Sequence, residues 1–178
     1  MRKRLCFLFI FMAVIILSLQ ARQYIGIPTT REIVEIEIAE NLCQIEKIER
    51  KYDVNMMSAI LAIVYIESDF KRGLIEKEIN VNDYSIGLTQ MRRDTARWIG
   101  KYKNLTDAEI ERRLLIPAVN MRLGIKYFCW QINRYDGNFK RAVSAYNAGT
   151  YTKANAYYYK RWLKAYNKYN KEANIYYE

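Results

Sequence analysis

The chain has 178 residues, of which 51% are hydrophobic and 27% charged; this composition excludes a disordered chain and fits one globular domain. Its net charge of +10 favours an anionic partner such as an envelope polymer or a membrane surface. The sequence contains no histidine, which excludes Ser-His-Asp and Cys-His catalysis and removes the commonest metal ligand. It also carries no metal-binding motif, so we expect neither a metal site nor a cofactor.

Residues 1–21 have the pattern of an N-terminal targeting segment, because a basic cluster at residues 2–4 precedes an uncharged, largely apolar run at residues 5–19. That run is long for a signal peptide and short for a membrane span of about 20 residues. Cleavage after Ala21 and retention as an uncleaved membrane anchor both remain open. Either outcome predicts an exported chain in the periplasm or cell envelope, which argues against nucleic acid as the partner of its positive charge.

Export also bears on the three cysteines of the chain. Cys6 lies in the targeting segment, which leaves Cys43 and Cys129 as a pair. An oxidising compartment permits a disulfide between them, and the alternative is two small side chains buried on helices.

We expect residues 29–178 to form a single all-α, mainly helical domain, because the helix breakers glycine and proline are scarce. Thr29 and Glu32 have the spacing of a capping box and predict the start of the first helix. Beyond them, apolar residues recur at steps of three and four. They predict one helical face, formed by Ile38, Leu42, Ile45, Ile48 and Tyr52.

The middle of the chain predicts a buried helix followed by a loop. Residues 56–66 are almost all apolar, which is typical of a buried helix, with Asp53 or Asn55 as its cap. The stretch 71–86 carries charges, a glycine and an Asn-Asp pair, and this composition favours a loop. A short helix is expected to follow and to end at Gly100.

The second half predicts three further helices and a helical tail. A Thr-x-x-Glu capping box at residues 106–109 opens one helix, and Pro117 suits the first turn of the next. Asn138 is expected to cap a helix that reaches Gly149. The Tyr- and Lys-rich tail from Tyr151 predicts a final amphipathic helix.

Glu67 is the candidate catalytic residue. Helical spacing places it on the same face as three apolar residues, Met56, Ile60 and Ile63. Because burying a charged carboxylate is costly, such a group becomes neutral or finds a partner, and a pKa raised toward neutrality suits a general acid. The alternative is a glutamate at a helix end that reaches solvent.

Two later segments carry side chains suited to sugar recognition. Ser85–Met91 contains a glycine that permits close backbone approach, followed by the donor and acceptor groups of Gln90. Ala145–Gly149 sets the aromatic Tyr146 beside the amide of Asn147. Taken singly, each segment is more typical of ordinary solvated side chains, because such short motifs recur by chance.

Together and in this order, these segments resemble the soluble lytic transglycosylase domain family, which has a lysozyme-like fold. The family pattern is an ES dipeptide that closes an apolar helix, then a GLMQ-like stretch, then AYNAG. Here the three parts are Glu67-Ser68, residues 87–90 and Ala145–Gly149, and the resemblance covers about residues 50–165.

The chain also departs from the family pattern. Lys71 and Arg72 stand where Asn-Pro is common, Thr89 replaces the usual Met, and Arg92 and Arg93 replace an apolar residue and a Pro. These departures bear on the glycan contacts and not on the catalytic glutamate.

The resemblance implies cleavage of peptidoglycan between N-acetylmuramic acid and N-acetylglucosamine without water, with formation of 1,6-anhydro ends. Glu67 would be the single acid/base, and Tyr146 would hydrogen-bond near it. Ser85, Gln90 and Asn147 would contact the glycan strand.

Three alternatives stay open at this point. A lysozyme-like hydrolase of the same fold would need a second carboxylate, with Asp83 or Asp94 as the candidates. A non-catalytic envelope-binding or assembly factor would keep the fold but not the activity, although an intact Glu67 argues against it. A basic surface-binding protein would act through its charge and lose binding in salt.

Overall fold

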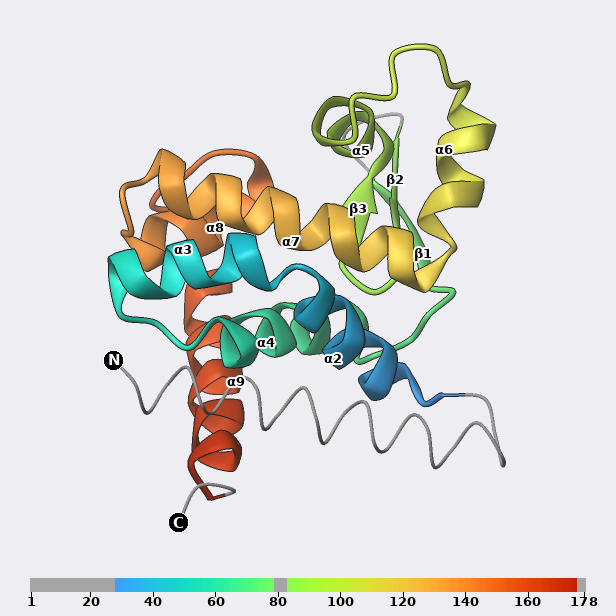
Figure 1. The fold of residues 1–178 in the computed structure, drawn as a ribbon. Coiled ribbons are helices and arrows are strands. Elements are labelled where there is room, and N and C mark those ends of the chain that lie inside the picture. The colour runs from blue at the N-terminus through green and yellow to red at the C-terminus, as the bar shows by residue number, and fades with distance from the viewer. Residues whose placement is uncertain (1–27, 79–82, 176–178) are drawn as a thin grey trace.

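The computed structural model describes residues 28–78 and 83–175, drawn as ribbons in Figure 1. The predicted targeting segment at residues 1–21, its apolar run and Cys6 lie outside the described residues. Within the described ranges, no helix combines the length and the apolar character that a membrane crossing requires.

The first two helices correct one prediction. α2 (Thr30–Glu40) begins with the expected capping box, in which Thr29 and Glu32 satisfy each other's backbone amides. The predicted single face from Ile38 onward is divided, because Asn41 leaves helical geometry and α3 (Leu42–Tyr52) starts after it. The Asn41 side chain donates to the carbonyl of residue 37 at 2.7 Å, and such side-chain bonds compete with a continuing helix.

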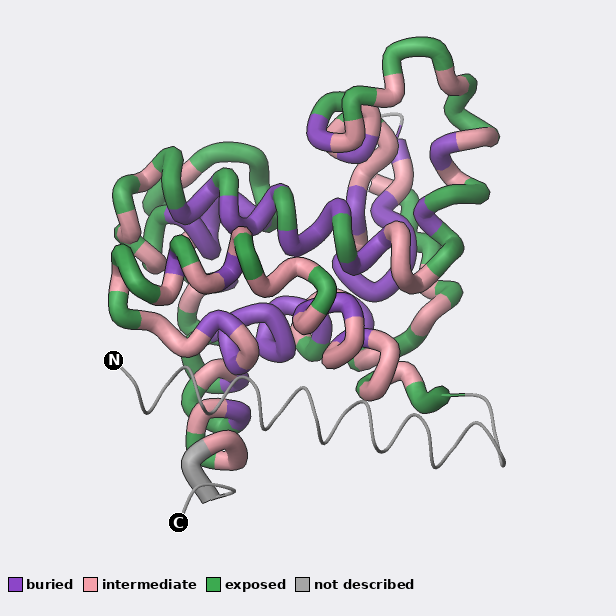
Figure 2. The backbone as a smooth tube through the Cα atoms, viewed as in Figure 1, coloured by how far each residue is buried: buried purple, intermediate pink, exposed green. Residues whose placement is uncertain are grey.

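The next helix, α4 (Met56–Ser68), is buried along most of its length (Figure 2). Asn55 caps it as predicted, since its side-chain oxygen accepts from the amide of Ser58 at 3.0 Å. The cap and the buried packing fix the position of α4, and Glu67 lies in its last turn.

A small antiparallel sheet occupies part of the stretch that the sequence predicted as a loop. Its strands are β1 (Ile75–Glu78), β2 (Asp83–Ile86) and β3 (Met91–Arg92), in the order β1-β2-β3. The loop prediction was wrong because β1 is an exposed, largely charged edge strand without apolar alternation. Pairing sets residue 76 opposite Ser85.

Three helices follow the sheet: α5 (Arg93–Ile99), α6 (Asp107–Leu114) and the long α7 (Pro117–Arg134). The predicted stops and starts are confirmed, with Gly100 at the end of α5, a capping box before α6 and proline in the first turn of α7. Figure 1 shows α7 running from the helical body toward the sheet, where α5 and α6 also pack.

The last two helices close the body of the domain. α8 (Phe139–Ala148) has the expected asparagine cap and ends at a left-handed glycine. α9 (Ala156–Ile175) begins five residues later than the predicted tail helix and packs against α4 and α8. The Trp162 indole of α9 donates to the carbonyl of Ala59 in α4 at 3.1 Å, which fixes the two helices together.

Both cysteines of the described residues are free thiols. Cys129 is buried in α7 and Cys43 is exposed on α3, so no disulfide forms, and only one of the two is a buried side chain.

The mainly helical fold class predicted from the sequence is confirmed, with a small sheet added to it.

Candidate active site

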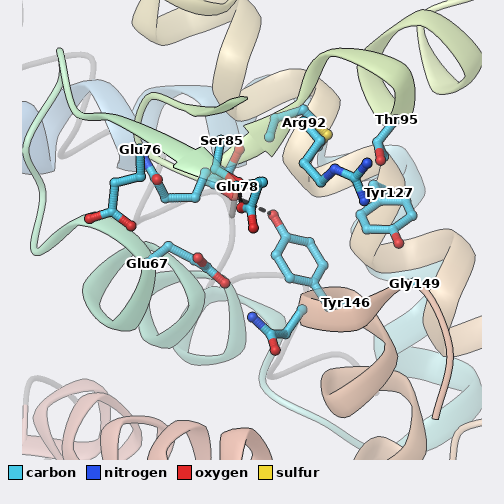
Figure 3. A pocket seen from close by; sticks show the side chains of 13 residues that line it. Glu67, Glu76, Glu78, Ser85, Arg92, Thr95, Tyr127, Tyr146 and Gly149 are labelled. Carbon is cyan, nitrogen blue, oxygen red and sulfur yellow. Dashed lines mark hydrogen bonds between the residues drawn. The ribbon is translucent and has the colours of Figure 1, made fainter. Parts of the chain in front are cut away.

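A pocket of about 290 Å³ lies where α4, the sheet, α5, α7 and α8 meet. Five lining residues are the ones that the sequence and the family resemblance singled out: Glu67, Ser85, Gln90, Tyr146 and Asn147. Figure 3 shows the carboxyl group of Glu67 directed into this pocket from the end of α4. Segments up to 80 residues apart in the sequence therefore meet at one place.

The environment of Glu67 favours its neutral form. Burial is the main cause and raises the pKa of this carboxyl from 4.5 to about 7, and the negative charges of Glu76 and Glu78 act in the same direction. A hydrogen bond from Tyr158 and the positive charge of Arg161 partly oppose this rise. At neutral pH the carboxyl group is consequently present in both protonation states.

Tyr158, on α9, is the hydrogen-bond donor to the Oε1 atom of Glu67. Burial and the neighbouring Glu67 charge raise the pKa of the Tyr158 phenol well above its usual value, so the phenol stays protonated and donates. The sequence did not single out this residue, because the Tyr-rich tail offers many tyrosines with no pattern to distinguish one. Only the packing of α9 against α4 identifies it.

Tyr146 lines the same pocket as Glu67 and hydrogen-bonds there to the backbone. Its hydroxyl donates to the carbonyl of Thr89 at 3.0 Å rather than to the carboxyl group of Glu67. The ring is buried and contacts Tyr127 and Phe128 in α7. Tyr146 thus ties α8 to the turn after β2 and forms a wall of the pocket.

The turn that carries Gln90 is held by buried polar contacts. Ser68, the partner of Glu67 in the ES dipeptide, donates through its hydroxyl to the carbonyl of Leu88 at 2.8 Å. Asn120 of α7 accepts from the amide of Thr89 at 2.9 Å and donates to the carbonyl of residue 86 at 2.7 Å. Hydrogen bonds therefore hold the ES dipeptide, the GLTQ stretch and α7 together.

Gly87 has a steric reason to be glycine. Its φ is +77°, and a Cβ atom there would lie 2.4 Å from the Nδ2 atom of Asn120. The side-chain amide of Gln90 in turn donates to the Gly87 carbonyl at 2.9 Å. Among the described residues, the Oε1 atom of Gln90 is buried without a hydrogen-bond partner.

The two remaining predicted contacts come from different elements, β2 and α8. The Ser85 hydroxyl donates to the Oε1 atom of Glu78 across the β1–β2 pair. Asn147 is exposed near the end of α8, where it lines the rim.

The second-carboxylate candidates predicted from the sequence do not line the pocket. Asp83 is buried against Arg93 and Arg92, with N–O distances of 2.8 and 3.1 Å, and although burial opposes it, these bonds lower its pKa. Asp94 is exposed on α5. The pocket carboxylates other than Glu67 belong instead to β1, where a predicted loop gave no reason to place them near Glu67.

The described ranges contain no group of three or more Cys, Asp or Glu side chains arranged to hold a metal ion. The side chains that line the pocket carry carboxyl, phenol, hydroxyl, amide, thioether and guanidinium groups.

The fold and pocket define a lysozyme-like helical domain with one pKa-shifted glutamate over a polar cleft. The model of the transglycosylase SLT domain family matches residues 44–170, and the chain belongs to this family. Its fold is similar to that of an inactive mutant of the lytic transglycosylase Slt from Pseudomonas aeruginosa, with a TM-score of 0.54 and 21% identity. The similarity covers 77% of this chain and 25% of that chain, so this chain spans about a quarter of that length. The comparison with curated proteins finds no match.

Proposed function

We propose that the chain is a peptidoglycan lytic transglycosylase that cleaves the bond between N-acetylmuramic acid and N-acetylglucosamine and leaves 1,6-anhydro ends. One observation carries the proposal: the Glu67 carboxyl, with its pKa raised to about 7, opens into the pocket where all three family motifs meet. The glutamate-to-glutamine mutant of the similar Slt enzyme is described as inactive, which agrees with a single essential glutamate.

Glu67 would serve in both halves of the reaction. As the acid it donates its proton to the glycosidic oxygen while the bond from that oxygen to the muramic carbon breaks. The resulting carboxylate then removes the proton of the 6-hydroxyl of the same sugar, whose oxygen bonds to that carbon and closes the anhydro ring. Because the first step regenerates the base, one carboxyl suffices, and a pKa near the working pH suits both roles.

The remaining site residues have supporting roles in this proposal. Gln90 has a buried carbonyl oxygen that is free to accept from a sugar hydroxyl or N-acetyl amide. Ser85 of the sheet and Asn147 of α8 would contact the strand, and Tyr146 would form a wall of the pocket. Peptidoglycan is the expected partner, and an anionic envelope polymer also fits the net charge of +10.

The expected location follows from the family and the N-terminal segment. A peptidoglycan-cleaving enzyme acts in the cell envelope, and the predicted signal peptide or anchor at residues 1–21 would deliver it there. No cofactor enters the proposed reaction.

A hydrolase of the same fold is the second candidate, favoured by one observation. Glu76 and Glu78 line the pocket that contains Glu67, so a carboxylate that activates water is available there, although it is neither of the predicted aspartates.

The test compares digestion of purified peptidoglycan by the wild-type chain and by Glu67→Gln, with Glu40→Gln as an exposed control. We expect the activity of the Glu67→Gln variant to fall about 10²- to 10⁴-fold, because Glu67 is the group that transfers protons in the proposed reaction. The control variant should keep the wild-type activity. Equal activity in the wild type and Glu67→Gln would refute the assigned role.

A further inference from the structure

Two tryptophans outside the pocket form an exposed aromatic pair. Trp98 on α5 is 51% exposed and Trp130 on α7 is 36% exposed. Their ring centroids lie 4.7 Å apart at an interplanar angle of 80°, so the two indoles contact each other edge to face. Tryptophan gains from burial, and a solvent-exposed pair is more typical of a binding surface than of a packing role.

The pair continues directly from the pocket wall. Thr95 and Tyr127 line the pocket, and Trp98 and Trp130 stand three residues later on the same helices, one turn farther along. Tyr127 stacks on Trp130 at 6.1 Å with an angle of 12°. Figure 3 shows Thr95 and Tyr127 at the end of the pocket away from Glu67.

A fixed positive charge stands beside the pair. The guanidinium of Arg134 lies 5.1 Å from the ring centre of Trp130 and donates to the carbonyl of Gly149 at 2.8 Å. Gly149 also lines the pocket, so Arg134 links the aromatic surface to the rim. A cation at this place suits the carboxylate groups that peptidoglycan carries.

We propose that Trp98 and Trp130 form a platform that binds a sugar ring of the glycan strand beyond the residues at the cleaved bond. This proposal rests on the function proposed above and deepens it. A pocket of about 290 Å³ is small for a polymeric substrate, given that pockets for drug-sized ligands measure roughly 300–1,000 Å³. The strand must run out over the neighbouring surface, and the axial C–H groups of a pyranose ring pack well on an indole.

The first test measures binding without cleavage. In the Glu67→Gln background, the purified full chain is sedimented with insoluble peptidoglycan after the changes Trp98→Ala, Trp130→Ala and both together. We expect five- to tenfold weaker binding for the double variant. Leu163→Ala is the matched control, because Leu163 on α9 is also 36% exposed but lies away from the pocket; it should bind normally.

The second test separates a platform from a structural role. In the active enzyme, Trp98→Ala/Trp130→Ala should raise KM for long strands severalfold with kcat kept, and change little for fragments too short to reach the pair. Trp98→Phe and Trp130→Phe should restore binding, because an aromatic face remains. An equal loss on long and short substrates would show instead that the pair only supports the pocket.

The two proposals fail in different ways. Wild-type binding by the double variant overturns the platform and leaves the lytic transglycosylase function intact. Tryptophan-dependent binding by a wild-type chain that cleaves no peptidoglycan supports the platform and contradicts the enzymatic proposal. A chain that binds no peptidoglycan at all overturns both.

Discussion

Two opposing influences act on the pKa of the Glu67 carboxyl group, and their balance sets that pKa near neutrality. Burial favours the neutral acid, whereas the phenol of Tyr158 donates to the charged form and favours the carboxylate. A fully exposed glutamate would be ionised at pH 7 and a fully unpartnered buried one would stay protonated. The observed arrangement holds the pKa between these limits.

The raised pKa of Glu67 predicts a pH-dependent stability. Because the folded state holds this proton more tightly than the unfolded chain, its contribution is fully present below pH 4.5 and is lost as pH rises through about 7. A glutamine at this position does not ionise, so the Glu67→Gln variant escapes this loss of stability. Its free energy of unfolding should exceed that of the wild type by about 3 kcal/mol at pH 8. Urea unfolding at pH 4 and pH 8 measures this, and an equal difference at both pH values would contradict it.

Tyr158→Phe tests the opposing influence. Without the phenol hydroxyl the carboxylate loses its donor, so the pKa of Glu67 should rise further. The fall of kcat/KM at alkaline pH should move upward by about one to two pH units, given that a hydrogen bond to a charged group contributes about 1.5–3 kcal/mol. Tyr159→Phe, on the same helix, is the control and should leave the profile unmoved.

At the residue scale, the sequence could predict Glu67 but not its partner. Helical spacing places a carboxylate on a buried stripe without any knowledge of the tertiary fold. Tyr158 reaches Glu67 across 91 positions of sequence, and that meeting depends on how α9 packs. Long-range contacts of this kind leave no local pattern.

At the scale of elements, the β1–β2 hairpin brings its own carboxylates into the pocket. Glu78 accepts from the Ser85 hydroxyl and adds to the negative charge near Glu67. The helices were predictable because caps and breakers mark them locally. The hairpin was not, because an exposed edge strand lacks the alternating pattern that a half-buried strand shows.

Glu78→Gln distinguishes a background charge from a catalytic base. If Glu67 acts alone, the variant should keep most of its activity, and its alkaline limb should move slightly downward, because one negative charge near Glu67 is gone. Kinetics across pH 5–9 provide the measurement. A fall in activity of about 10²- to 10⁴-fold would instead identify Glu78 as a water-activating base.

The turn between β2 and β3 depends on one buried amide. Asn120→Ala removes the groups that pair with the Thr89 amide and the carbonyls of residues 86 and 114. We expect a cost of about 2–4 kcal/mol, because several buried polar groups lose their partners. Thermal unfolding measures it, with the exposed Asn133→Ala on the same helix as a near-neutral control.

At the scale of the whole molecule, α7 joins the helical body to the sheet, and the pocket lies at their junction (Figure 1). Its carboxylates therefore come from both parts of a chain with a net charge of +10. A negative pocket within a basic molecule separates two tasks. The overall charge suits an anionic polymer, and the carboxylates of β1 add to the effect of burial in raising the pKa of Glu67.

In the proposed reaction, Glu67 acts without water as a reactant. Peptidoglycan is digested by the wild-type chain in water enriched in ¹⁸O, and the new muramic ends are weighed by mass spectrometry. A lytic transglycosylase should leave ends that are lighter than a hydrolysed end by one water and carry no label. Hydrated ends that contain ¹⁸O would contradict it and would identify the enzyme as a hydrolase.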